Sequence, residues 1–160
     1  MARGTLKIFS GGQTGVDRAA LDAAIEKRLS YGGWCPRGGW AEDLPEPPGL
    51  LAIYPHLQET PLSDPAQRTQ WNLRDANRLM VLVDHAGLTV SKGTESARGF
   101  AEKLGRPLIV LDLDVDDALD RARGFLDQGE GAHTLCIAGP RESEAAGIYL
   151  KARTFLLRLL

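Results

Sequence analysis

Short apolar runs alternate with amphipathic stretches along most of the chain. The runs predict strands over residues 6–10, 79–83, 108–111 and 134–138. After each run, apolar residues recur every three to four positions, which is the period of a helix. These helical stripes consist of Val16, Ala20, Ala23 and Ala24; Ala97, Phe100, Ala101 and Leu104; Val115, Ala118, Leu119, Ala122 and Leu126; and Ile148, Ala152, Phe155, Leu156 and Leu159. Strands that alternate with helices are typical of a parallel α/β sheet, and 160 residues suffice for one domain, residues 1–160.

A further helix is predicted over residues 65–78, ahead of the strand that begins at Leu79. Arg68, Asn72 and Asp75 recur at positions i, i+4 and i+7, so they share one face of this helix. That face is either solvated, or Arg68 and Asn72 reach the glycine-rich loop that follows the first strand. Trp71 is expected to pack into the core.

Between Ser30 and Asp64 the alternation is lost. This segment holds most of the prolines of the chain, together with five glycines. It is too long for a simple strand-to-helix connection, so it is either functional or flexible. We predict short strands only near residues 33–35 and 52–57.

Composition narrows the possible partners and the compartment. The chain is 43% hydrophobic and 25% charged, as soluble globular proteins are, and its net charge of -2 favours neither nucleic acid nor an acidic membrane surface as a partner. No apolar run approaches the roughly 18 residues of a membrane span. Cys35 and Cys136 are far apart and lack metal-ligand spacing. We therefore expect a cytoplasmic protein with reduced thiols and no metal site.

The loop after the first strand is the clearest candidate site. Glycines let a backbone approach a ligand closely, and the free N–H groups of the following helix attract an anion such as phosphate. The loop matches neither the dinucleotide fingerprint nor a P-loop, and a tight capped turn is the alternative. The residues that we assign to it are Gly11, Gly12, Gln13, Thr14, Gly15, Asp17 and Arg18. A carboxylate fits poorly beside a phosphate, so Asp17 is expected to hold a hydroxyl, a metal or Arg18.

Two other loops lie at the ends of predicted strands, and the carboxyl ends of parallel strands converge on one crevice. Gly93, Thr94 and Glu95 open the helix that follows the second apolar run, as an anion seat or as an ordinary helix cap. The last strand is followed by Gly139, Pro140, Arg141 and Ser143, in which the guanidinium is suited to clamp an oxyanion. The alternative for this loop is a plain Gly-Pro turn with a surface Arg–Glu pair.

A fourth loop carries aromatic side chains. Trp34 and Trp40 flank Cys35 and Arg37, and exposed indoles can stack on a flat heterocycle. Packing over the sheet edge is the alternative. No histidine lies near Cys35 in the sequence, so the sequence does not support a cysteine nucleophile.

Together these motifs resemble the family called "putative molybdenum carrier protein", in the circularly permuted branch of the SLOG superfamily of Rossmann-like nucleotide-ligand binders. The similarity runs nearly end to end, with matching segments at residues 10–19, 33–38, 41–43, 68–69, 93–94 and 138–143, and at Asn72 and Asp75. It implies a Rossmann-like, doubly wound, mainly parallel sheet with helices on both faces. It also implies a site for a phosphate-bearing ligand at the carboxyl ends of the strands, with molybdenum cofactor indicated by the family name.

The leading hypothesis is a binding or carrier protein for a phosphorylated heterocycle, either molybdenum cofactor or a nucleotide-like ligand. Arg141 and the amides of residues 11–15 would hold the phosphate, with Thr94 assisting, and Trp34 or Trp40 would cover the ring. No residue is dedicated to molybdenum.

An enzyme is the alternative, because nucleotide phosphoribohydrolases of the same superfamily carry Pro-Gly-Gly-x-Gly-Thr-x-x-Glu. Residues 90–94 lack the Pro-Gly-Gly, and the glutamate position falls on Ala97, so Asp17 or Glu95 would have to replace that carboxylate. A nucleotide-sensing module is a third reading. Residues 155–160 have apolar side chains on more than one helical face, which predicts a homo-oligomer.

Overall fold

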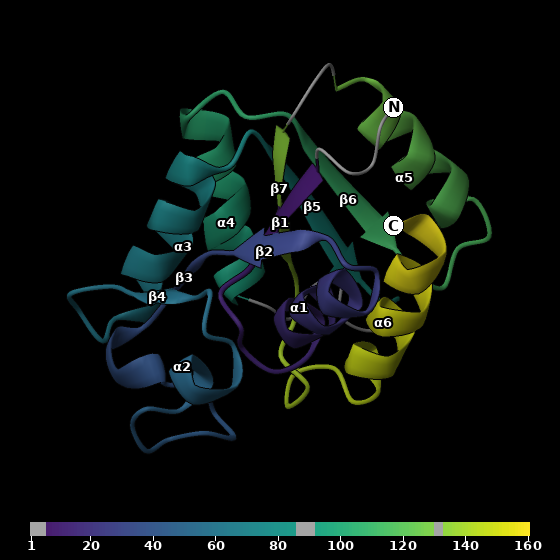
Figure 1. Cartoon of the computed structure of the whole chain (residues 1–160). Coiled ribbons are helices and arrows are strands. Elements are labelled where there is room, and N and C mark those ends of the chain that lie inside the picture. The colour runs from purple at the N-terminus through teal and green to yellow at the C-terminus, as the bar shows by residue number, and fades with distance from the viewer. Residues whose placement is uncertain (1–5, 86–91, 130–132) are drawn as a thin grey trace.

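A parallel sheet forms the centre of the molecule in a computed structural model, which describes residues 6–85, 92–129 and 133–160 (Figure 1). The strand order is β2-β1-β7-β5-β6, and every neighbouring pair is parallel. The strands are β1 (Leu6–Phe9), β2 (Ser30–Gly32), β5 (Arg78–Val83), β6 (Leu108–Asp112) and β7 (His133–Ala138). All six residues of β5 are buried, as expected for a strand covered on both sides.

Helices cover both faces of this sheet, as predicted (Figure 1). The helices α1 (Val16–Glu26), α5 (Ala118–Asp127) and α6 (Ile148–Leu159) pack against one face and enclose the largest core cluster. The helices α3 (Pro65–Asp75) and α4 (Lys92–Lys103) cover the other face around Leu79, Val81 and Val83. The predicted α/β architecture is therefore confirmed.

The sheet order is that of a doubly wound fold read from a different starting strand. If β7 is counted as the first strand, followed by β1, β2, β5 and β6, the order becomes 3-2-1-4-5. This is the order of Rossmann-type sheets, which bind ligands where the strand order reverses. Here the reversal lies between β7 and β5, so the circular permutation places the last strand of the chain at the centre of the expected site.

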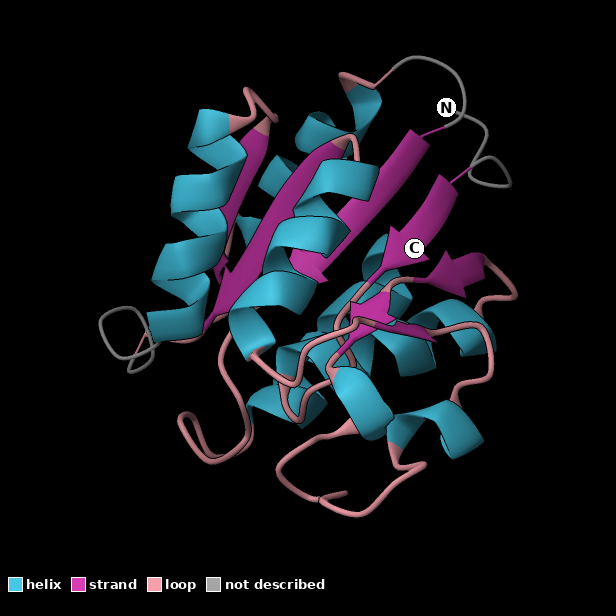
Figure 2. Ribbon diagram, turned by 90° about the vertical axis from the view of Figure 1, so that its left-hand side faces the viewer, coloured by secondary structure: helices cyan, strands magenta, loops and turns pink. Residues whose placement is uncertain are grey.

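The proline-rich segment folds as a small lobe beside the sheet (Figure 2). It contains β3 (Trp34–Cys35), η2 (Arg37–Gly39), α2 (Leu50–Ile53) and β4 (Gln58–Glu59), and β3 pairs with β4. Cys35 and Leu50 are fully buried in the third core cluster, so the lobe has a core of its own. The strand predicted over 52–57 is wrong: residues 50–53 form a helical turn after Gly49, and pairing starts only at Gln58.

Three other predictions at the level of single elements need correction. The helix predicted to reach residue 78 ends at Asp75, because Arg78 already pairs with Leu135 as the first residue of β5. Val115 is 47% exposed and precedes α5 instead of belonging to its apolar stripe. Trp71 is half-buried against Trp34, with ring centroids 4.7 Å apart, and is absent from the core clusters of the described residues.

The terminal helix α6 packs mostly within the domain. Leu156 and Leu159 are buried, while Phe155, Leu157 and Leu160 are partly buried against the same core cluster. The second apolar face, which led us to expect self-association, is thus largely used inside the domain. The homo-oligomer remains a prediction.

Candidate functional site

The loops after β1 and β7 are locked together at the carboxyl end of the sheet. The amide of Val16, the first residue of α1, donates to the carbonyl of Pro140 at 3.2 Å. A Cβ at Gly15 would lie 2.2 Å from that carbonyl oxygen, and the φ of Gly15 is +79°. A Cβ at Gly139 would lie 2.2 Å from the carbonyl oxygen of Leu82. Because any side chain would collide with backbone at both positions, these two glycines hold the junction of β1, β5 and β7 closed.

A cleft of about 520 Å³ lies where the strand order reverses, and we call it the inner cleft. The loop after β1, the loop after β7 and the first turn of α4 each contribute residues to its wall. The residues of the wall with polar or aromatic side chains are Gln13, Asp17, Trp40, Arg68, Thr69, Thr94, Arg141 and Glu144. The structure therefore brings together three of the predicted loops with Arg68 and Thr69 of α3.

Asp17 forms an ion pair with Arg68 at the base of the inner cleft. Arg68 reaches from α3 across Gly11 and donates to the Asp17 carboxylate at 2.8 Å. Burial is the largest influence on Asp17 and raises its pKa above the usual value, although the adjacent Arg68 opposes that shift. The expectation that Asp17 holds Arg18 is wrong, because Arg18 instead makes a bidentate pair with Asp43, at 2.9 and 2.8 Å.

Backbone amides of the glycine loop are already engaged within the protein. Gly12 N–H donates to the hydroxyl of Ser10 at 3.2 Å, and Thr14 N–H donates to the side-chain carbonyl of Gln13 at 3.0 Å. With Val16 N–H bound to Pro140, three of the amides that we expected to face a phosphate have partners. A ligand at this site would therefore have to rely on side chains for most of its contacts.

Glu42 gathers side chains from both loops. Its carboxylate accepts hydrogen bonds from the hydroxyl of Thr14 and, at 2.7 Å, from the hydroxyl of Ser143. It also accepts from the Ser143 amide at 3.4 Å and from the Arg141 guanidinium at 3.2 Å. These hydrogen bonds and the charge of Arg141 hold the pKa of Glu42 below its usual value, even though burial acts in the opposite direction. Arg141 also contacts Glu144 at 3.2 Å, so its charge is shared between two carboxylates.

A second cleft of about 900 Å³ lies on the other side of Glu42, and we call it the outer cleft. Its wall contains one cation, Arg18, and the carboxylates of Asp22, Glu42, Asp43 and Glu142. The two oxygens of Asp22 accept hydrogen bonds from two tyrosines of that wall, Tyr54 at 2.6 Å and Tyr149 at 2.5 Å. Burial and Asp22 together raise the pKa of Tyr149 to about 12 and raise that of Tyr54 as well.

Eleven predicted site residues are absent from the wall of the inner cleft. Four of them line the outer cleft instead, namely Thr14, Gly15, Arg18 and Ser143. The other seven line neither cleft, namely Gly11, Gly12, Trp34, Arg37, Asn72, Glu95 and Pro140.

Trp34 packs on Trp71 and donates its indole N–H to Asp75 at 2.8 Å. Asn72 bonds both the amide and the carbonyl of Trp34 and so supports β3. Arg37 lies in η2 of the small lobe, and Glu95 is exposed and paired with Arg98. Of the three polar residues on the shared face of α3, only Arg68 reaches the glycine loop, while Asn72 and Asp75 contact Trp34.

Sequence reasoning missed Glu42 and Glu144, the two carboxylates that hold Arg141. A signal for Glu42 was present, because residues 41–43 are among the segments that carry the family resemblance. The sequence did not show that Glu42 pairs with Arg141, because Arg141 lies 99 positions further along the chain.

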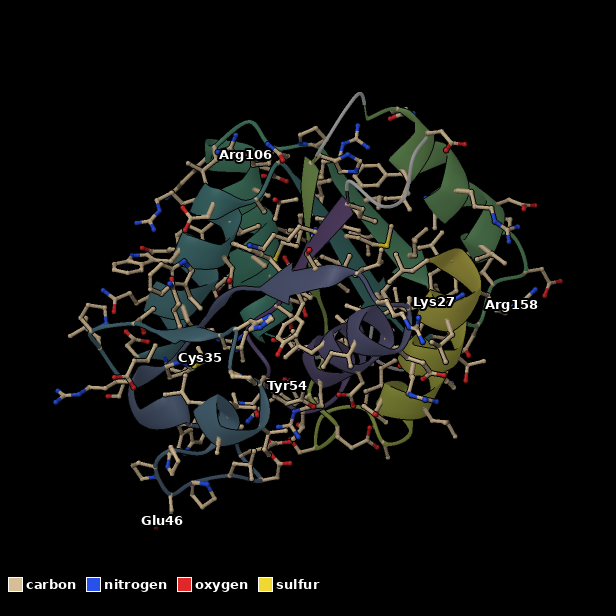
Figure 3. All side chains as sticks on the ribbon, in the orientation of Figure 1. Lys27, Cys35, Glu46, Tyr54, Arg106 and Arg158 are labelled. Atoms are coloured by element: carbon tan, nitrogen blue, oxygen red, sulfur yellow. The ribbon has the colours of Figure 1, made fainter. Side chains whose placement is uncertain are left out.

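The two thiols are not suited to nucleophilic or metal chemistry. Burial raises the pKa of Cys35 to about 11 and that of Cys136 to about 12, so both stay protonated near neutral pH. Figure 3 shows Cys35 inside the small lobe, beside α2. Within the described part of the chain there is no cluster of three or more His, Cys, Asp or Glu side chains arranged to hold a metal. No helix in those ranges has the length and apolar character needed to cross a bilayer.

Comparison with known proteins agrees with the fold and identifies the family. The model of the circularly permutated YpsA SLOG family matches residues 8–160. The chain belongs to this family. Among solved structures, it is similar to a crystal structure at 1.45 Å resolution of a "putative molybdenum carrier protein" from Syntrophus aciditrophicus SB, with 35% sequence identity and a TM-score of 0.80. The match covers 96% of this chain and 92% of that one, while no curated protein matches. SLOG membership and the permuted strand order thus support each other.

Proposed function

We propose that this SLOG protein binds a phosphorylated heterocycle in the inner cleft and carries it without changing it. The observation on which this rests is the position of Arg68 and Arg141 in one cleft at the strand-order reversal. Doubly wound folds bind nucleotide-like ligands at this place, and a planar guanidinium matches a phosphate with paired hydrogen bonds. The inner cleft is also the less acidic of the two, because its two arginines balance Asp17 and Glu144.

The ring of the ligand would lie against Trp40. This indole belongs to the wall of the inner cleft, whereas Trp34 lies with Trp71 on the outside of α3. An indole face favours a flat heterocycle such as a pterin or a purine. Thr94, at the start of α4, is 8% exposed and adds a hydroxyl to the same wall.

Molybdenum cofactor is the first cargo that we propose, since the similar solved structure is named as a molybdenum carrier. The residues present fit the pterin and phosphate parts of such a cargo. They do not offer thiolate or imidazole ligands to the metal in the described chain, because both cysteines are buried and no metal-binding cluster is present there. The cargo would therefore be held by its organic part.

The decisive experiment identifies the bound molecule. Native mass spectrometry of gently purified protein should show a mass above that of the free chain, and mild denaturation should release a phosphorylated heterocycle. Purified protein should then bind a pterin phosphate or guanosine monophosphate in calorimetry and return it chemically unchanged. A protein that binds neither compound at millimolar concentration contradicts the proposed function.

Hydrolysis of a nucleoside monophosphate is the second candidate, because Asp17 is a buried carboxyl with a raised pKa at the wall of the inner cleft. Such groups are typical of general acids and bases. Glu95, the other carboxylate that we considered, is exposed and is not part of that wall. Wild type and Asp17→Asn should be incubated with a panel of nucleoside monophosphates. Steady release of free base by wild type alone would establish the enzyme and overturn the carrier.

We also propose a cytoplasmic homo-oligomer that does not bind nucleic acid. Static light scattering over micromolar concentrations tests the assembly. A mass of 17.3 kDa throughout would reject self-association, whatever the ligand is.

A further inference from the structure

The hydrogen-bond donors around Glu42 have the composition of an oxyanion site. Two hydroxyls, one backbone amide and one guanidinium converge on a single carboxylate. They come from the loop after β1 and the loop after β7, which meet where doubly wound folds bind phosphate. Protein sites for phosphate use these same kinds of donor.

We infer that these donors form a phosphate seat, which the Glu42 side chain fills in the free protein and which a ligand phosphate enters by displacing Glu42. The inference rests on the proposed function and adds to it a competing anion supplied by the protein. A carboxylate carries one negative charge and two oxygens, while a phosphate dianion offers more charge and one more oxygen to the same donors. An incoming phosphate can therefore replace every contact that Glu42 gives up.

The surroundings of Glu42 support a displaceable role. Its side chain is 22% exposed and lies between the two clefts, because Thr14, Glu42 and Ser143 line the outer cleft while Arg141 lines the inner one. Solvent therefore reaches the carboxylate. Displacement would move only the side chain, since the Glu42 amide is anchored separately by Gln13 at 2.9 Å.

The neighbouring residue Asp43 supplies a matched control. Asp43 ties the same loop to α1 through its bidentate pair with Arg18, whereas the hydrogen bonds to Thr14, Ser143 and Arg141 are made by Glu42. Asp43→Asn therefore weakens the tie between this loop and α1, while the Glu42 carboxylate stays bound to its four donors. Glu42→Gln keeps the size of the side chain, removes its charge and replaces one of its two acceptor oxygens with a donor.

The test is a titration of wild type, Glu42→Gln and Asp43→Asn with inorganic phosphate at constant ionic strength, followed by calorimetry. Glu42→Gln should bind phosphate about tenfold more tightly than wild type, since a charged competitor is lost from charge-assisted hydrogen bonds. Asp43→Asn should stay within about twofold of wild type. In wild type, the ¹³C resonance of the Glu42 carboxyl should shift as phosphate is added, which is a readout that needs no variant.

The outcomes separate the inference from the proposed function. Equal affinities of wild type and Glu42→Gln, with no shift of the Glu42 carboxyl, would make Glu42 a structural tie and leave the carrier function standing. Equal tightening in both variants would assign the effect to a loosened loop and would also overturn the seat. Absence of phosphate binding in all three proteins would remove the seat and the proposed phosphate site together.

Discussion

The loops after β1 and β7 contribute residues to both clefts, but the clefts differ in charge. The inner cleft has two arginines and two carboxylates, Asp17 and Glu144, whereas the outer cleft has one arginine and four carboxylates. The outer cleft is the larger, at about 900 Å³ against about 520 Å³. Volume alone would assign the ligand to the outer cleft, but a phosphate there would face an excess of negative charge. Charge and strand order together favour the inner cleft.

The contact between the loops after β1 and β7 can be disrupted at Gly15, and we expect this change to give the largest effect. Gly15→Ala places a Cβ against the Pro140 carbonyl at a positive φ, and we expect a loss of about 3 kcal/mol or more in the free energy of unfolding. Urea denaturation measures this loss. Gly124→Ala is the matched control, because that helical glycine has open space around it and alanine should add about 0.5–1 kcal/mol. Equal stabilities of the two variants would contradict the close contact between the loops.

The assignment of phosphate to the inner cleft depends on Arg141. Arg141→Ala should weaken phosphate binding by roughly 10- to 150-fold, since a charge-assisted contact contributes about 1.5–3 kcal/mol. Calorimetry with inorganic phosphate gives the affinity, and circular dichroism should show an intact fold. Arg158→Ala is the control, because that exposed arginine lies at the outer end of α6 (Figure 3). If both variants bind like wild type, the phosphate does not contact Arg141.

Two half-buried indoles, Trp34 and Trp40, sharpen the comparison further. Trp40→Ala should weaken the binding of guanosine monophosphate by about 2- to 10-fold and leave inorganic phosphate unaffected, because only the ring contact is lost. Trp34→Ala should change neither affinity, since Trp34 lies against Trp71. Fluorescence titrations measure both. A larger effect from Trp34 than from Trp40 would move the ring to the outer side of α3.

The residues of the outer cleft should affect the stability of the fold mainly at high pH. The pKa of Tyr149 is about 12 in the folded state and lies above the unfolded value of 10. The contribution of Tyr149 to the free energy of unfolding is therefore fully present below pH 10 and is lost as the pH rises toward 12. Tyr149→Phe removes this titration. Compared with wild type, it should lose less stability between pH 10 and 12, by at most about 1 kcal/mol because the group is partly solvated. Urea midpoints at pH 9, 10 and 11 give the difference, and parallel curves would contradict the Tyr149–Asp22 contact.

Local patterns predicted the sheet and its helices well because most apolar residues of those elements are buried, although Ile25 and Leu150 are exposed. The run at 79–83 is buried throughout, and the stripe from Ile148 to Leu159 marks α6 correctly. The segment between residues 30 and 64, which contains β2 and the small lobe, gave no such signal. Its strands have two or three residues, and both residues of β4 are exposed. Elements this short are stabilised by distant partners, which a local pattern cannot show.

The candidate site was predictable as a set of loops but not as a set of contacts. Glycines before a helix identified the loop at 11–15, and Gly139 identified its partner. The pairing of Asp17 with Arg68 spans 51 positions, and that of Glu42 with Arg141 spans 99. Which arginine meets which carboxylate depends on the strand order, and a single sequence contains no direct record of that order.

The permuted strand order also has a consequence for folding during synthesis on the ribosome. β7 pairs with both β1 and β5, so the middle of the sheet is synthesised after both of its neighbours. Until residues 133–138 leave the exit tunnel, β1 and β5 each present an unpaired edge to solvent, and α1 lacks its packing partner α6. Nascent chains that end before His133 should therefore recruit chaperones or aggregate, and the native state should form in a late, nearly all-or-none step.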